Sequence, residues 1–123
     1  MRQPEAIIQN QIMSYLKFKG IFAWQNKSTG TYDAKAKRFR KPGLWFLRGT
    51  ADILGCLPGG RILCIEVKTK RGTLTPEQKS FLQEIRLRGG LSVVARSVTD
   101  VELALKQYIG GRVEGDVSVT EPE

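Results

Sequence analysis

The 123-residue sequence contains no histidine and only two cysteines. The absence of histidine excludes a histidine general base, a Ser-His-Asp triad and zinc sites that depend on imidazole. Cys56 and Cys64 lie in predicted strands and lack the Cys-x-x-Cys spacing of a metal or redox site, so we expect two buried, reduced thiols. Carboxylate and lysine side chains therefore remain for acid-base or metal chemistry.

Long apolar runs are also missing. No stretch approaches the roughly 18 residues of a membrane span, and the first five residues do not lead into the apolar core of a secretory signal. We therefore expect a cytoplasmic protein with no membrane partner. The length suits one domain, which we place at residues 1–109, followed by a flexible acidic tail at residues 110–123.

Basic residues concentrate in one part of the chain. The net charge is +8, and residues 27–48 hold seven basic residues against a single acid, Asp33. This distribution suits a polyanionic partner, and nucleic acid is the first candidate. A polar segment of this length is too long for a simple connection, so we predict a basic DNA-binding loop. Its candidate DNA contacts are Lys35, Lys37, Arg38, Arg40, Lys41 and Arg48.

Four aromatic residues are interleaved with these charges, namely Tyr32, Phe39, Trp45 and Phe46. They would suit contact with nucleic-acid bases. Trp45 and Phe46 could equally anchor the segment on the core, and the basic residues could simply form a solvated face.

The sequence pattern predicts an α/β fold in the order α-β-β-β-α-β-α. After Pro4, apolar residues recur at helical spacing and predict the buried stripe of a first helix, namely Ile8, Ile12, Tyr15 and Leu16. Thr75-Pro76-Glu77-Gln78 has the N-cap, first-turn proline and capping-box glutamine of a second helix. Short apolar runs bounded by glycine or proline predict strands. We expect helices at about 4–19, 75–88 and 97–109 and strands at 21–24, 51–57, 61–67 and 91–96, which together make a mixed sheet flanked by helices.

A hairpin is predicted around Pro58-Gly59-Gly60, which separates two of the strands. If the loop is these three residues, counting back in step places Asp52 opposite Glu66, with β carbons about 5 Å apart. Lys68, two residues beyond Glu66 on the same strand, then shares that face. A loop of two or four residues would put the two acids on opposite faces.

Asp52, Glu66 and Lys68 therefore form a candidate catalytic set. Magnesium prefers carboxylate and carbonyl oxygens, and a nearby ammonium can steer a water or neutralise charge on phosphate. Gln78 points from the head of its helix toward the end of the Glu66 strand, and Glu5 falls on the apolar stripe of the first helix. Simpler interpretations exist: a solvated Glu-x-Lys strand end, a capping role for Gln78, and a first-turn acid favoured by the helix dipole for Glu5.

Together these residues resemble the VRR-NUC (virus-type replication-repair nuclease) branch of the PD-(D/E)XK nuclease superfamily. The likeness spans residues 4–105 and implies a restriction-endonuclease-like fold and metal-dependent cleavage of DNA in a bacterial or phage-infected cell. It also implies a homodimer that prefers branched DNA such as four-way (Holliday) junctions. Ala51 stands where the superfamily name has proline. The matching residues are Gly49-Thr50-Ala51-Asp52, Glu66-Val67-Lys68, Gln78 and Glu5.

The resemblance also implies a role for each site residue. Asp52 and Glu66, with the Val67 backbone carbonyl, would hold one or two Mg2+ or Mn2+ ions, and Glu5 would act through a water. Lys68 would orient the attacking water or offset negative charge on the phosphate.

Gln78 would position Lys68 or a water, and Lys70 and Arg71 are candidates for phosphate contacts. A nuclease acting on flaps, ends or linear duplex remains an alternative. A nonenzymatic DNA-binding protein with purely structural acids is another.

Overall fold

The computed structural model describes residues 4–26, 32–33, 35, 38–39 and 45–110. Seven elements build the domain in the predicted order α-β-β-β-α-β-α. Two further short strands, β2 (Tyr32–Asp33) and β3 (Arg38–Phe39), lie in the segment predicted as a basic loop. The seven elements are α1 (Glu5–Phe18), β1 (Phe22–Gln25), β4 (Ile53–Cys56), β5 (Ile62–Val67), α2 (Pro76–Leu87), β6 (Leu91–Ala95) and α3 (Val98–Gly110).

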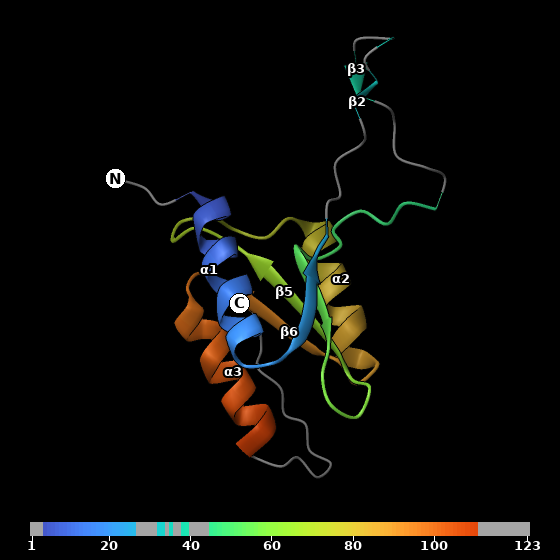
Figure 1. Cartoon of the computed structure of the whole chain (residues 1–123). Helices are drawn as coiled ribbons and strands as arrows, with labels where there is room; N and C mark the ends of the chain where they lie inside the picture. Colours follow the sequence, from blue (N-terminus) through green and yellow to red (C-terminus); the bar gives the residue numbers. More distant parts are fainter. Residues whose placement is uncertain (1–3, 27–31, 34, 36–37, 40–44, 111–123) are drawn as a thin grey trace.

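The central sheet is mixed and has the strand order β1-β4-β5-β6. The first three strands pair antiparallel, whereas β5 and β6 are parallel because helix α2 carries the chain back across the sheet. Strands β2 and β3 form a separate antiparallel pair. Figure 1 shows α1 and α3 on one face of the central sheet and α2 on the other.

The β4–β5 hairpin has the predicted register. The Leu57 N–H donates to the Arg61 carbonyl at 2.7 Å, and Ile53 pairs with Ile65. Gly59 and Gly60, at φ of +89° and +86°, make the turn in a backbone region that favours glycine. The paired residues end at Ile53 and Ile65, one step before Asp52 and Glu66.

The two faces of the sheet bury different clusters. On one face, Ile8, Ile12 and Leu16 of α1 pack with Val101 and Leu105 of α3 over the apolar side of the strands. On the other face, the side chains of Ala51, Cys64 and Leu82 form a smaller cluster under α2. Ala51 of this smaller cluster directly precedes Asp52, and Cys64 lies two residues before Glu66 on β5.

The two cysteines differ in burial. Cys64 is buried as predicted, and burial raises the pKa of its thiol to about 12. Cys56 is exposed, so the prediction of two buried thiols is wrong for this residue. Cys56 is exposed because α2 packs on β5 and β6, whereas Cys56 lies on β4 beside the edge strand β1. Both thiols are free.

Helix α1 departs from its predicted stripe at one residue. Ile8, Ile12 and Leu16 are buried as expected, but Glu5 is exposed in the first turn, directly after Pro4. Its neighbours Pro4 and Ala6 are exposed as well, so the buried part of the helix begins at Ile8. None of the described helices is long and apolar enough to cross a membrane.

Some predicted features lie outside the described residues. They are the tail beyond residue 110 and the basic residues Lys37, Arg40 and Lys41.

Candidate active site

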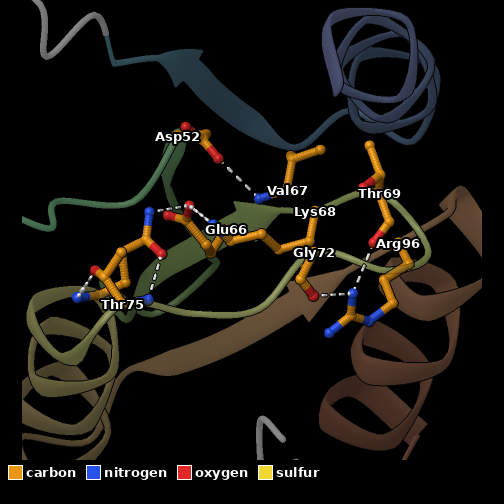
Figure 2. A network of polar contacts seen from close by, with 9 residues as sticks. Asp52, Glu66, Val67, Lys68, Thr69, Gly72, Thr75 and Arg96 are labelled. Atoms are coloured by element: carbon orange, nitrogen blue, oxygen red, sulfur yellow. Dashed lines mark hydrogen bonds and ion pairs between the residues drawn. The ribbon is translucent and has the colours of Figure 1, made fainter. Parts of the chain in front are cut away.

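Backbone contacts from two neighbouring strands hold Asp52. The Asn26 N–H donates to the Asp52 carbonyl at 2.8 Å, and the Asn26 side-chain amide donates to the Ala51 carbonyl at 3.3 Å. The Asp52 Oδ2 atom accepts a hydrogen bond from the Val67 N–H at 2.8 Å (Figure 2). Its carboxylate therefore leans across the hairpin toward the end of β5.

Gly49 allows this segment to approach the head of α2. Its φ is +85°, and a β carbon at this position would lie 2.4 Å from the Glu77 carbonyl oxygen and 2.9 Å from the Gln78 nitrogen. Any other residue would displace backbone atoms on one side or the other. Glycine at position 49 therefore fixes the spacing between the Asp52 segment and the helix that carries Gln78.

Glu66 is the buried centre of the site, with only 3% of its surface exposed. Its Oε2 atom accepts a hydrogen bond from the Gln78 Nε2 at 2.8 Å and lies 3.8 Å from the Lys68 Nζ. Figure 2 shows the Lys68 side chain running back along β5 toward this carboxylate. Within the described residues, the Glu66 Oε1 atom is buried and has no hydrogen-bond partner.

The pKa of Glu66 is raised from about 4.5 to about 8. Burial is the largest cause, because removal from water disfavours the charged form, and the neighbouring Asp52 carboxylate adds to it. The Lys68 ammonium opposes the shift, and Glu5 contributes a smaller repulsion. The folded chain therefore keeps the proton on Glu66 to a higher pH than an exposed glutamate would.

Gln78 both caps helix α2 and contacts the Glu66 carboxylate. Its backbone N–H donates to the Thr75 Oγ1 and its side-chain Oε1 accepts from the Thr75 N–H, which makes the predicted capping box. The same side chain uses its amide N–H to hold Glu66. The helix cap therefore also sets the direction of an active-site carboxylate.

The donor set suits a hard divalent cation. Asp52 and Glu66 face each other across the hairpin, and the orphaned, buried Glu66 oxygen and the raised Glu66 pKa indicate a charge that a cation would relieve. Among the described residues, no three acidic, cysteine or histidine side chains form a cluster, so two carboxylates are what the protein offers here. Glu5 does not complete a third ligand, although it contributes to the field at Glu66.

The predicted DNA-contact residues that the structure describes lie in three separate segments of the chain. Lys70 and Arg71 are exposed in the turn after Lys68, and Arg48 is exposed just before Gly49. Lys35 is exposed between β2 and β3, and the backbone of Arg38 belongs to β3. Of the predicted DNA contacts that the structure describes, Arg48, Lys70 and Arg71 are nearest in sequence to the two acids.

Sequence reasoning missed Asn26 and Arg96. Asn26 positions the Asp52 segment, and the Arg96 guanidinium donates to the carbonyls of Thr69 and Gly72. Their partners lie 24 to 27 positions away in the chain. No local spacing could have indicated these contacts; the only available signal was the predicted adjacency of the strands.

The fold and the acidic strand ends together are those of an α/β nuclease domain, and the comparisons identify the family. Residues 8–99 match the VRR-NUC domain, so the chain belongs to the VRR-NUC domain family. This membership implies a nuclease, with DNA as its substrate. Comparison with curated protein sequences gives no match.

Two solved structures share the fold. A VRR-NUC domain protein is similar over 98% of this chain and all of its own, with a TM-score of 0.69 and 23% identity. A second structure of a VRR-NUC domain is similar over 85% of this chain and 96% of its own, with a TM-score of 0.59 and 22% identity.

Replacing Gly49 by alanine should disrupt the site more than the same change at Gly59. Both glycines have a positive φ, which costs alanine roughly 1–2 kcal/mol, but only Gly49 faces backbone atoms within 3 Å. We therefore expect Gly59→Ala to lower the Tm by roughly 4–10 °C and Gly49→Ala to lower it further, measured by thermal unfolding. Equal losses would contradict the close approach to α2.

Glu66→Gln should stabilise the metal-free protein increasingly as the pH rises from 5 to 8. The pKa of Glu66 is about 8 in the folded chain, above its ordinary value, so the folded wild type loses stability through this interval, whereas glutamine does not titrate. Thermal unfolding in chelator should show the Tm difference growing by a few degrees, equivalent to about 1 kcal/mol or more. The exposed Glu77→Gln serves as control and should show no such trend.

Proposed function

We propose that this protein is a metal-dependent endonuclease that hydrolyses phosphodiester bonds in DNA, with a preference for branched DNA such as four-way junctions. One observation carries the proposal: the carboxylates of Asp52 and Glu66 meet across the hairpin, with the Lys68 ammonium and the Gln78 amide on Glu66. A buried carboxyl group with a raised pKa, next to a second carboxyl group and a lysine, is typical of a catalytic site.

The metal would be Mg2+ or Mn2+. Asp52, Glu66 and the Val67 backbone carbonyl would hold it, and Glu5 would act only through water, in line with its exposed position. When bound, such an ion neutralises phosphate charge and makes water more acidic.

The side chains around the carboxylates have separate tasks in this proposal. Gln78 fixes the direction of the Glu66 carboxylate through its hydrogen bond. Lys68, buried beside Glu66, supplies a fixed positive charge for the scissile phosphate or orients the attacking water. Because Lys68 is almost fully withdrawn from solvent, its charge is only weakly screened there.

We base the preference for branched DNA and the homodimer in this proposal on the resemblance to the family. A homodimer would present two such sites, which suits paired cuts in a four-way junction. The surplus of basic residues at 27–48 supports a phosphate-binding role for that segment.

Asp52→Asn, Glu66→Gln and Lys68→Ala should each abolish cleavage while DNA binding persists. Each change removes a ligand or a charge without altering the sheet, so loss of rate by at least about 100-fold is expected. The assay incubates end-labelled four-way junction, flap and linear duplex with each protein, with and without Mg2+ or Mn2+. Paired symmetric cuts in the junction alone would support the branched substrate.

Two outcomes would contradict the assignment. Full activity in purified Asp52→Asn protein would remove Asp52 from the catalytic set. If the protein cleaves none of these substrates with any divalent ion, the result would favour the alternative of a nonenzymatic DNA-binding protein.

Neutralising Lys37, Arg38, Arg40 and Lys41 together should weaken DNA binding uniformly across sequences. For every phosphate that the variant no longer neutralises, the slope of log affinity against log salt concentration should flatten by roughly 0.9. Binding titrations at several salt concentrations measure this slope, and an unchanged slope would move the DNA surface elsewhere. As a control, neutralising the exposed residues Lys17 and Lys19 at the C-terminal end of α1 removes two positive charges from another part of the chain.

A further inference from the structure

The turn that follows the active-site strand is held by the side chain of Arg96, the residue directly after strand β6. After Lys68 the chain leaves the sheet and makes a turn at Thr69–Gly72, closed by the Gly72 N–H donating to the Thr69 carbonyl at 3.1 Å. The Arg96 Nη1 atom donates to these same two residues, to the Thr69 carbonyl and the Gly72 carbonyl at 2.7 Å each. A third, longer contact reaches the Lys70 carbonyl at 3.5 Å.

The sheet explains why Arg96 reaches this turn. Strands β5 and β6 are parallel and end side by side. Val67 pairs with Ala95, and the Lys68 N–H donates to the Ala95 carbonyl at 3.0 Å. Arg96 is the next residue, so its side chain emerges beside the turn, as Figure 2 shows. Its own N–H donates to the Asp100 carboxylate at 2.8 Å, which ties its backbone to the first turn of α3.

The turn carries two exposed cations that follow Lys68 closely in the sequence. Lys70 and Arg71 are exposed, whereas the residues on either side of them, Thr69 and Gly72, are partly buried and held by Arg96. A β carbon on Gly72 would lie 3.4 Å from the Lys68 side chain, so the turn also lies against the lysine of the site. The position of the turn thus determines where both phosphate-binding cations lie relative to Glu66 and Lys68.

We infer that Arg96 is a positioning residue for DNA binding: its guanidinium holds the Thr69–Gly72 turn so that Lys70 and Arg71 meet the phosphates flanking the cleaved bond. This inference rests on the proposed function. Arg96 acts through backbone carbonyls, so its positive charge is used inside the protein and the contacts to DNA belong to Lys70 and Arg71. Ordering the turn before binding removes an entropic cost that the complex would otherwise carry.

Tryptic cleavage tests the structural half of the inference. Trypsin cuts after lysine and arginine, so cleavage after Lys70 or Arg71 reports opening of the turn. Arg96→Met keeps the length and apolar stem but removes the donors, and cleavage at the turn should accelerate about tenfold, since hydrogen bonds from a charged donor are among the stronger ones. Arg96→Lys retains a charged donor and should restore part of the protection. Unchanged cleavage in Arg96→Met would overturn the inference.

A double-mutant cycle tests the functional half. In chelator, with a four-way junction and with linear duplex as probes, Arg96→Met should lower affinity about tenfold at 0.1 M salt, near the value of one phosphate contact. In a Lys70→Gln/Arg71→Gln background the same change should have no further effect, because the cations it positions are gone. Arg88→Met, which removes an exposed arginine paired with Glu84, controls for net charge and should leave affinity unchanged.

The outcomes separate this inference from the proposed function. Equal losses of affinity in both backgrounds would assign Arg96 to general stability or to direct contact with DNA and would overturn the positioning role. Failure to cleave any substrate would refute the proposed endonuclease, yet the trypsin and binding measurements need no cleavage and would still decide the role of Arg96.

Discussion

The site depends on keeping the Glu66 carboxylate out of water. A carboxylate buried at the end of a central strand is unfavourable in its charged form, and the raised pKa of Glu66 reflects that strain. The neighbours that make its burial tolerable come from different elements: Lys68 from the end of β5 and Gln78 from the head of α2. The packing of α2 against the sheet therefore determines the surroundings of the two Glu66 carboxylate oxygens.

Several small residues allow this arrangement. Gly49 lets the Asp52 segment lie against the first turn of α2, and the capping box with Thr75 gives Gln78 a fixed side-chain direction. Neither feature is specific to catalysis, because positive-φ glycines and capping boxes occur in many folds. Here each also determines where a carboxylate or its hydrogen-bond donor lies, so local stability and site geometry rest on the same residues.

The hairpin was predictable because its rules are local. A three-residue turn and a side-chain period of two predict Asp52 opposite Glu66, and the structure has the predicted pairing as far as Ile53 and Ile65. Exposure was harder to predict. Cys56 and Glu5 were expected to be buried, but burial depends on which neighbouring element covers a residue, and α2 covers β5 and β6 and leaves Cys56 open. Asn26 and Arg96 act on residues too distant in the chain for spacing to reveal.

The sequence by itself determined the order of the elements, the hairpin register and the types of side chain available for chemistry, since turn residues, caps and periodicity act over a few positions. Only the tertiary structure decided that Glu66 is buried, with one oxygen that has no hydrogen-bond partner among the described residues. It also decided that Gln78 donates to Glu66 and that Arg96 holds the Thr69–Gly72 turn. These contacts join separate elements, and they arise from how the helices and strands pack, which no local pattern encodes.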